Sequence, residues 1–503
     1  LYGGAINLAG SVKGKKTAKH AVSDWMEIEK QRGISVTSSV MQFEYDGYCV
    51  NILDTPGHED FSEDTYRTLM AADSAVMVID ASKGVEKQTI KLFKVCVLRH
   101  IPIFTFINKM DRQSKDPFEL LDNIESILGI STCPMNWPIG SGKEFKGVYD
   151  RGTKEVNMFT AEMNGQKEVN TWNVPIDDPT IDDQIGDYFR EKLEEDMELL
   201  EGAGSEFDLD EVRAGNLTPV FFGSALTNFG VETFLQHFLK MTESPASRES
   251  NLRVIEPEEE DFSAFVFKIQ ANMNKAHRDR IAFIRIVSGE FDAGMEAWHV
   301  QSNKKVKLSQ PTQIMASERQ IVDKAYAGDI IGIFDPGTFA IGDTLCSSKD
   351  KFAFEGIPTF PPEHFARVKQ LDTMKRKQFV KGITQIAQEG AVQIFQEYIT
   401  GMEEIIVGAV GTLQFDVLKF RLASEYNVDI GLEQLPYEYI RYISNQDEFD
   451  PDSINGTSDM KKIRDLKGNV LLLFVHEWSI RMVQERNKGL ELSEFGTGGL
   501  KRE

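Results

Sequence analysis

The chain has 503 residues with 56 Lys or Arg and 79 Asp or Glu, which gives a formal net charge of −23 at pH 7. Its 41% hydrophobic and 27% charged content excludes a disordered or fibrous chain, and its length predicts about three domains. No apolar run approaches the ~20 residues of a membrane span, so we expect a soluble, cytoplasmic protein without membrane contact. The four cysteines lack CxxC spacing, which disfavours zinc and disulfides and predicts buried free thiols.

The first part of the chain alternates short apolar runs with polar, helix-compatible segments. This texture is typical of buried parallel strands with helices between them, and it predicts a doubly wound α/β sheet. A later apolar run precedes a helix with Val231, Phe234 and Phe238 at helical spacing, and we expect both to belong to the same sheet. The predicted strands are CVNILD (49–54), SAVMVID (74–80), IPIFTFI (101–107) and PVFFGSAL (219–226).

A long interruption at about 130–215 is predicted to be an insertion in this sheet. Its second half, residues 176–213, holds fifteen Asp or Glu against three Lys or Arg, a net charge of −12. A second acidic run, EPEEED (256–261, net −5), follows a stretch with Pro and Ser and predicts a linker at a domain boundary.

The texture changes after the linker. Regularly spaced β-branched and aromatic strands with Gly and Asp turns predict a β-barrel, and the later order of strand, helix, two strands, helix, strand predicts a ferredoxin-like domain. The predicted units are an α/β domain (1–245), a barrel (258–352), a ferredoxin-like α/β domain (355–490) and a flexible tail (491–503).

The strand NILD ends in DTPGH, residues 54–58, at the carboxyl end of a predicted parallel strand, where ligands of open α/β folds bind. A carboxylate such as Asp54 can hold Mg²⁺ through water, and Gly57 can offer its backbone N–H to a terminal phosphate. The alternative is an ordinary strand-to-helix turn, in which Asp54 caps the helix and Gly57 relaxes the backbone.

The strand IPIFTFI ends in NKMD, residues 108–111. The two carboxylate oxygens of Asp111 can accept both N–H groups of a guanine edge, a pairing that adenine cannot offer. Asn108 can contact the base or tie loops together, and the stem of Lys109 can cover a flat ring. A polar loop after a strand is the alternative interpretation.

Two further segments complete the order of motifs. Ser35 in RGISV (32–36) carries a hydroxyl that can complete an Mg²⁺ shell, and the backbone of GSAL (223–226) can meet the guanine carbonyl. Taken singly, Ser35 is equally a turn residue and Ser224 equally a helix N-cap. The occurrence of four such segments in one order favours the nucleotide interpretation.

RGISV, DTPGH, NKMD and GSAL together resemble the second to fifth guanine-nucleotide motifs of the translational GTPases. The resemblance implies a GTPase that binds GTP, GDP and Mg²⁺, in which His58 positions the attacking water. A satisfied loop histidine is the alternative for His58. The implied residues are Asp54, Thr55, Pro56, Gly57 and His58, then Asn108, Lys109, Met110 and Asp111, then Ser224, Ala225 and Leu226 for nucleotide, with Ser35 and Asp54 for the metal.

The resemblance covers the whole chain. AYAGDIIGIF (325–334) is similar to the barrel of these factors, and EEIIVGAVGTLQFDVLKFRL (403–422) is similar to the third domain of elongation factor G. Segments 1–14, 23–43, 54–69 and 408–428 closely resemble the bacterial release factor 3 family, which also tolerates Ser at the position of Ser35.

The release factor 3 family implies a ribosome-stimulated GTPase of termination that removes class I release factors from the ribosome. We expect the ribosome and these factors as partners, and a monomer off the ribosome. Elongation-type or ribosome-protection GTPases would need further domains after the ferredoxin-like one. A ribosome-binding scaffold that does not hydrolyse GTP is the alternative from another class.

One motif of the family is absent from these residues. The phosphate-cradling sequence G-x-x-x-x-G-K-[ST] does not occur, because Gly14 and Lys15 are followed by Lys16. Since the other motifs have no use without a phosphate cradle, we expect the natural protein to carry this strand and loop before Leu1. The expectations about GTP apply to that intact protein.

The net charge argues against an overall basic coat of the kind that phosphate binders usually show. Two basic stretches, 268–285 and 364–381, nevertheless lie in the predicted second and third domains. Such clusters are often solvated faces, but they are also candidate contacts for ribosomal RNA. The charge therefore does not exclude a ribosomal partner.

Overall fold

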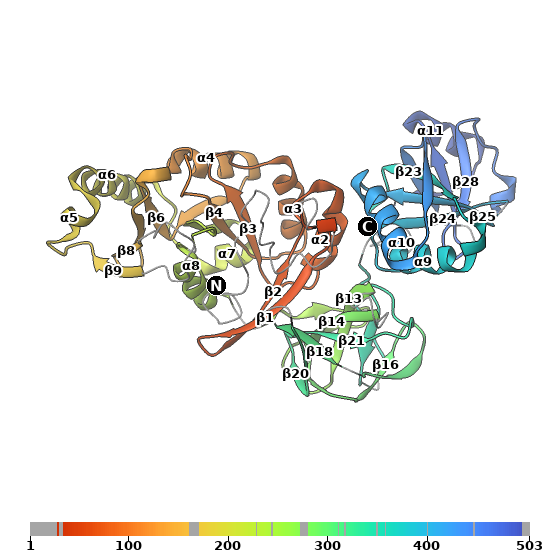
Figure 1. Ribbon diagram of the computed structural model, residues 1–503, viewed down its shortest axis with the longest axis horizontal. Coiled ribbons are helices and arrows are strands. Elements are labelled where there is room, and N and C mark those ends of the chain that lie inside the picture. Colours follow the sequence, from red (N-terminus) through yellow and green to blue (C-terminus); the bar gives the residue numbers. More distant parts are fainter. Residues whose placement is uncertain are drawn as a thin grey trace.

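The structure is a computed structural model, and Figure 1 shows its three units: an α/β unit, a β-barrel unit and a second α/β unit. Among the sequence predictions, those for the first 27 residues, for Arg32 and for the tail after 494 lie outside the described part. The described residues are 28–29, 34–159, 171–227, 229–242, 245–271, 280–309, 311–315, 318–348, 351–357, 359–399, 401–445 and 448–494.

A four-stranded parallel sheet forms the centre of the first unit, with the strand order β3-β4-β10-β5. Every residue of β10 is buried, as expected for a parallel strand covered on both faces. This confirms the predicted α/β sheet for three of its strands. The strands are β3 (Ala75–Asp80), β4 (Ile103–Asn108), β10 (Leu217–Phe222) and β5 (Ser131–Pro134), with helices α3 (Lys87–Leu98), α4 (Pro117–Leu128) and α8 (Val231–Met241).

The strand that carries DTPGH differs from the prediction. Among the described residues, β2 (Tyr48–Asp54) pairs only with β1 (Ser39–Tyr45), and the pairing is antiparallel. The turn between them is Asp46-Gly47, and both residues have positive φ (49° and 78°). An Asp-Gly turn between apolar runs is a strong hairpin signal, so the sequence contained the evidence for this ladder.

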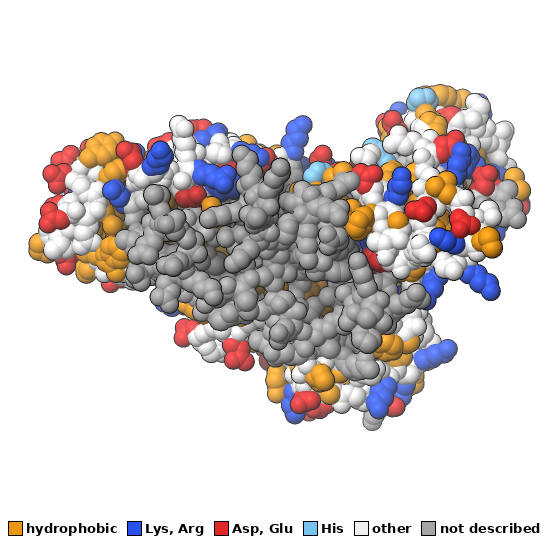
Figure 2. Space-filling view, viewed as in Figure 1, with side chains coloured by type: hydrophobic (Ala, Val, Ile, Leu, Met, Phe, Trp, Pro, Cys, Tyr) orange, Lys and Arg blue, Asp and Glu red, His pale blue; other side chains and the backbone are white. Residues whose placement is uncertain are grey.

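The insertion predicted at about 130–215 begins later than expected, because β5 (Ser131–Pro134) still belongs to the parallel sheet. It forms a four-stranded antiparallel sheet, β6-β7-β8-β9, followed by three helices. Figure 2 shows acidic side chains gathered at this end of the molecule. The elements are β6 (Asn136–Ile139), β7 (Gly147–Asp150), β8 (Glu155–Phe159), β9 (Thr171–Pro175), α5 (Ile181–Ile185), α6 (Asp187–Ala203) and α7 (Leu209–Ala214).

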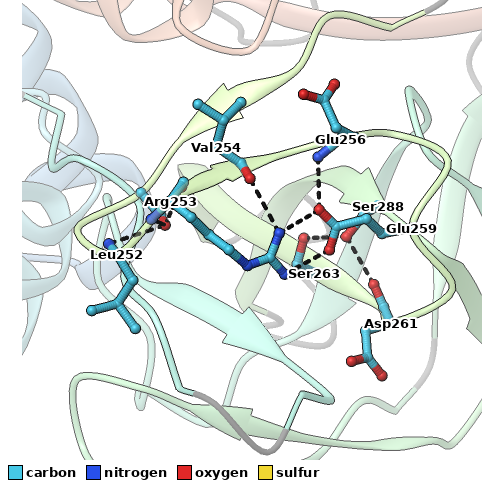
Figure 3. A network of polar contacts seen from close by, with 9 residues as sticks. Leu252, Arg253, Val254, Glu256, Glu259, Asp261, Ser263 and Ser288 are labelled. Atoms are coloured by element: carbon cyan, nitrogen blue, oxygen red, sulfur yellow. Dashed lines mark hydrogen bonds and ion pairs between the residues drawn. The ribbon is translucent and has the colours of Figure 1, made fainter.

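The linker to the barrel is held by polar contacts rather than left as a loose chain (Figure 3). Arg253 donates from Nη1 and Nη2 to the two carboxylate oxygens of Glu259, at 2.5 and 2.7 Å. The backbone N–H of Glu256 donates to the same carboxylate at 3.0 Å. Ser288 in the barrel donates to the carbonyl of Asp261 at 2.8 Å. The acidic run therefore continues into the barrel as an ordered segment.

The barrel unit is an eight-stranded sheet around a core of aliphatic and phenylalanine side chains. Its longest strands, β13 (Ser263–Ala271) and β14 (Arg280–Ser288), are buried at every position because one face meets the barrel core and the other meets the first unit. The other six strands of this sheet are β16 (Glu296–His299), β17 (Lys304–Lys307), β18 (Thr312–Met315), β19 (Glu318–Ile321), β21 (Ile330–Phe334) and β22 (Thr344–Cys346). Strands β15 (Glu290–Asp292) and β20 (Lys324–Tyr326) form a separate antiparallel pair.

The third unit contains the predicted ferredoxin-like order and extends it. Four strands have the spatial order β26-β23-β25-β24, with helices α9 and α10 between them in the chain, and four more strands enlarge the sheet to eight. The elements are β23 (His364–Gln370), α9 (Arg376–Gln388), β24 (Gln393–Glu397), β25 (Gly401–Ala409), α10 (Leu413–Tyr426), β26 (Ile430–Leu435), β27 (Tyr439–Ile443), β28 (Met460–Arg464), β29 (Val470–Phe474), α11 (Glu477–Arg486) and β30 (Leu492–Ser493).

Two sequence predictions about individual side chains are wrong. Cys49 is exposed, whereas the other three cysteines are buried. The described cations of the basic stretch 268–285 do not form a solvated face, since Lys268, Arg280 and Arg285 are each at most 7% exposed and form ion pairs with carboxylates. A charge count along the sequence does not distinguish a surface cluster from cations that are buried between domains.

Candidate nucleotide site

The carboxyl ends of β3, β4 and β10 lie at one edge of the parallel sheet. The register pairs Asp80 with Asn108 and Phe222 with Ile107, so the residues that follow these strands are neighbours. This edge brings NKMD and GSAL together, as the sequence predicts. We call residues 108–111 and 224–226 the base edge.

Side chains tie the two loops of the base edge. Asn108 Oδ1 accepts hydrogen bonds from the backbone N–H of Ala225 (2.9 Å) and of Lys109 (2.8 Å). The hydroxyl of the fully buried Ser224 donates to Asp111 Oδ1 at 2.6 Å. Asn108 therefore connects the loops, one of the two roles that the sequence left open, and Ser224 fixes the carboxylate of Asp111.

Met110, in the middle of NKMD, is anchored in the core of the first unit. Met110 is fully buried, and its N–H donates to the carbonyl of Gly223 at 3.1 Å. Leu226, in contrast, is exposed at 44%. Met110 therefore anchors the loop to the core, which accounts for an apolar residue in this otherwise polar loop.

Asp80 contacts the base edge, and the sequence prediction did not include it. Lys109 Nζ donates to Asp80 Oδ2 at 2.7 Å, so the lysine head points to the end of β3. Partial burial alone would raise the pKa of Asp80, but hydrogen bonds from Lys109 and Ser82 outweigh it and lower this pKa to about 2. The available signal was position, because Asp80 ends a strand next to the one that ends at Asn108.

A second group of motif residues lies at the end of the β1–β2 hairpin. Since Ser39 pairs with Asp54, the segment Ile34–Ser38 and the segment Thr55–Phe61 leave the hairpin at the same end. Ser35 and Asp54 are thereby brought to one end of the ladder. We call residues 34–38 and 54–61 the hydrolysis edge.

The DTPGH loop is supported by the helix that follows it, α2 (Ser62–Leu69). Thr65 Oγ1 donates to the carbonyl of the buried Pro56 at 3.2 Å. Gly57 is exposed, and a Cβ placed on it would meet no atom within 4 Å. Among the described residues, none would clash with a side chain at position 57, so steric crowding does not explain why this residue is glycine.

His58 caps the short helix η1 (Glu59–Phe61) with its ring. Its Nδ1 accepts a hydrogen bond from the N–H of Asp60 at 3.2 Å, and the ring keeps 39% of its surface exposed. The ring is thus a partly satisfied loop histidine that is still accessible to a ligand.

The segment Ile34–Ser38 is fastened by residues that no sequence pattern connects to it. Ser38 donates from its N–H (2.5 Å) and hydroxyl (2.7 Å) to Asp64 in α2. Lys268 of β13 donates to the carbonyl of Ser38 at 2.7 Å and lies 3.4 Å from Asp64. Burial would raise the pKa of Asp64, but Lys268, Arg67 and Ser38 outweigh it and lower the pKa.

The third unit also reaches the hydrolysis edge. Phe61 packs against Val36 and against Val417 of α10 in one small core. Arg67 in α2 donates to the carbonyl of Gly390 at 2.8 Å. Figure 1 shows the α9 and α10 side of the third unit turned toward α2. The hydrolysis edge is therefore a junction of all three units.

Among the described residues, no group of three or more His, Cys, Asp or Glu side chains is arranged to hold a metal ion. None of the helices in that part of the chain is both long and apolar enough to cross a membrane.

Three family models match successive parts of the chain. Residues 2–244 match the elongation factor Tu GTP binding domain, residues 261–348 match elongation factor G domain 2, and residues 354–484 match the C-terminal domain of the class II release factor RF3.

Curated relatives match over nearly the whole length. Peptide chain release factor 3 of Symbiobacterium thermophilum is 58% identical over 490 residues, which cover 97% of this chain and 92% of that protein. The protein of the same name from Gloeobacter violaceus is 50% identical over 495 residues, with coverages of 98% and 93%. A solved crystal structure of the Thermus thermophilus protein ttk003000868 shares the fold with a TM-score of 0.66 at 18% identity, over 93% of this chain and 69% of that chain.

The nucleotide-binding domain, the barrel that follows it and the strand-end motifs define a translational GTPase. The chain belongs to the peptide chain release factor 3 family. It is a ribosome-associated GTPase of translation termination that binds guanine nucleotide and hydrolyses GTP. The resemblance predicted from the motifs is confirmed, and the elongation-type and non-hydrolysing alternatives are not favoured.

Proposed function

We propose that the base edge selects guanine. Asp111 accepts the two N–H groups of the base, and the Ser224 hydroxyl at 2.6 Å keeps its carboxylate in one orientation. Asn108 joins the loops through Ala225 at 2.9 Å, and the backbone of Ser224–Leu226 meets the base carbonyl. The stem of Lys109 covers the ring while its head stays on Asp80.

We propose that the hydrolysis edge holds the phosphate end of the nucleotide. Asp54 supports Mg²⁺, Ser35 supplies a hydroxyl to the ion, and the segment Thr55–Gly57 places the Gly57 N–H toward the γ-phosphate. The donors fit this ion, because Mg²⁺ prefers a few oxygen ligands completed by water and phosphate rather than a cage of protein groups. The hairpin register, which brings Ser35 and Asp54 to one end, supports the assignment. When bound, Mg²⁺ neutralises phosphate charge.

We propose that His58 positions the attacking water. Its ring is accessible at 39%, and the hydrogen bond from the Asp60 N–H occupies Nδ1, which leaves Nε2 as the atom available to a water. General acid–base and positioning residues of this kind must lie within hydrogen-bond reach of the nucleophile.

The biological step proposed for the chain is GTP-driven removal of class I release factors from the ribosome after peptide release. The relatives' names support it, and the partners are the ribosome and those factors. We further propose a cytoplasmic protein that is monomeric off the ribosome, with functional units at 1–245, 258–352 and 355–490. The single observation that carries the function is the joining of NKMD and GSAL through Asn108 and Ser224, in a chain of this family.

The test uses the natural full-length protein. Titration with GDP, GTP and ATP should show binding of both guanine nucleotides and no binding of ATP. Co-sedimentation with ribosomes that carry a class I release factor should show loss of that factor in GTP and its retention in GDP. Equal binding of ATP would contradict the role of Asp111, and retention of the factor in GTP would contradict the biological step.

A further inference from the structure

Asp60 lies between the ring of His58 and the third unit. Its N–H donates to His58 Nδ1 at 3.2 Å, and its Oδ1 lies 3.3 Å from the same ring nitrogen. Its other carboxylate oxygen, Oδ2, accepts the backbone N–H of Leu413 at 2.7 Å. One side chain thus contacts the ring proposed to position water and the start of α10.

The contacts on the His58 side determine how the ring is held. A ring nitrogen that accepts a hydrogen bond carries no proton, so the neutral imidazole is protonated at Nε2. If the ring becomes charged, Nδ1–H can instead donate to Asp60 Oδ1, which is already 3.3 Å away. Asp60 therefore contacts Nδ1 with both its N–H and its carboxylate, which leaves Nε2 for another partner.

The contacts on the other side make the position of Asp60 depend on the third unit. The N-cap residue of α10, Thr412, makes no side-chain capping bond, so Asp60 supplies the carboxylate at this helix N-terminus from another unit. A Cβ placed on Gly411 would overlap the Asp60 carboxylate. Gln414 fixes this loop, because its Oε1 accepts the N–H groups of Val410 and Gly411 at 2.7 and 3.2 Å.

Hydrophobic packing keeps the same geometry rigid. Phe61, the next residue, is 4% exposed and packs with Val417 of α10. If α10 moves away, Asp60 loses its hydrogen bond and Phe61 loses part of its core. The turn that carries His58 then has fewer contacts to hold it.

We infer that Asp60 is a positioning residue through which docking of the third unit sets the orientation of His58, so that hydrolysis is fast only when α10 lies against the turn Glu59–Phe61. The inference rests on the role proposed above for His58. It makes the rate of GTP hydrolysis depend on how the units are arranged, which the nucleotide motifs alone do not predict.

The experiment approaches Asp60 from both sides in the full-length protein. Asp60→Ala removes the side chain that contacts both His58 and Leu413. Gly411→Ala places a methyl group against the Asp60 carboxylate and changes no residue of the first unit. Both variants should lower kcat of ribosome-stimulated GTP hydrolysis on the order of 10- to 100-fold, with KM for GTP within about twofold of wild type. Asp60→Asn retains an oxygen for the Leu413 N–H and should restore most of the rate.

A spectroscopic readout separates positioning from a general loss of structure. The ring ¹⁵N signals of His58 should move in Asp60→Ala and in Gly411→Ala, while the thermal unfolding midpoint confirms that each variant is folded. Asp122→Ala is the matched control, since Asp122 is an exposed aspartate on α4 that lies outside both edges. It should leave the rate and the His58 signals unchanged.

His58→Ala, measured in parallel, separates the two levels of the hypothesis. If His58→Ala hydrolyses GTP like wild type, the proposed role of His58 fails. If His58→Ala is slow while Asp60→Ala has the wild-type rate and unchanged His58 signals, the role of His58 stands and the inference about Asp60 is overturned.

Discussion

The base edge and the hydrolysis edge are built from the same kind of motif but supported in different ways. The contacts of the base edge described above come from its own unit, through neighbouring strand ends at Asp80, Asn108 and Gly223. The hydrolysis edge is held by α2 of its own unit and, in addition, from outside by Lys268 of the barrel and Leu413 of the third unit.

This difference separates two properties of the protein. The proposed recognition of the base relies on contacts within the first unit, so we expect it to be insensitive to how the units are arranged. We propose that hydrolysis depends on the junction of the three units, so that a change in their arrangement would change its rate. The four predictions that follow aim to break one edge while leaving the other intact.

The largest effect is expected from His58→Ala. Loss of a group that positions the nucleophile should slow ribosome-stimulated GTP hydrolysis by about 10²- to 10⁴-fold, with GDP affinity unchanged because the base edge is intact. Stopped-flow or quench-flow measurement of phosphate release tests it. His476→Ala is the control, because the ring of His476 stacks on Trp478 in the third unit and lies outside both edges. A wild-type rate in His58→Ala would refute the catalytic role.

Asp111→Asn should break the base edge alone. Hydrogen bonds to a charged acceptor contribute about 1.5–3 kcal/mol each, so GDP affinity should fall on the order of 100-fold. The new amide N–H can donate to the 2-oxo group of xanthine, so a xanthine nucleotide should bind better than GDP. Titration with both nucleotides measures this. Asp116→Asn, which alters only the cap of α4, should leave both affinities at the wild-type values.

At saturating nucleotide, Asp111→Asn should hydrolyse at nearly the wild-type rate, because the hydrolysis edge is untouched. A kcat reduced as strongly as the affinity would show that the two edges are not independent.

Lys268→Met should weaken the hydrolysis edge from the barrel side. Removal of one partner from a buried ion pair leaves Asp64 and the carbonyl of Ser38 without their cation, which should lower the free energy of unfolding by about 3 kcal/mol. Hydrolysis should slow on the order of tenfold, and GDP affinity should stay within about twofold. Urea unfolding and phosphate release measure these. Lys304→Met, on an exposed barrel strand, is the matched control, and an equal effect there would contradict the assignment.

The smallest effect is a dependence on pH. The folded-state pKa of Asp64 is lowered, so its contribution to stability is fully present above its unfolded pKa of about 3.9 and is lost as pH falls through the folded value. The difference in unfolding free energy between wild type and Asp64→Asn should therefore shrink below about pH 4. A difference that is constant from pH 6 to pH 3 would be inconsistent with this ion pair.

The sequence predicted the base edge well because its residues end neighbouring strands. Apolar runs followed by NKMD and GSAL place Asn108, Asp111 and Ser224 at one sheet edge without any knowledge of the other units. Asp80 satisfied the same rule and could have been included. The third unit was similarly readable, since the alternation of strands and helices determined the order of β23–β26.

The hydrolysis edge was predicted only in part. Lys268 is 230 residues from Ser38 in the sequence, and Leu413 is 353 residues from Asp60, so their contacts depend on how separate units dock. Hydrophobic periodicity along the sequence carries no information on how separate units dock against one another. The same limit made the stretch 268–285 look like a surface cluster when its described cations are buried at the junction.

Hydrogen exchange of the full-length protein, compared between wild type and Gly411→Ala, tests the central claim most directly. We predict faster exchange in peptides that cover 34–38 and 58–61, and unchanged exchange in peptides that cover 108–111 and 223–226. Unchanged exchange at 58–61, or an equal increase at both edges, would contradict the claim that only the hydrolysis edge depends on the arrangement of the units.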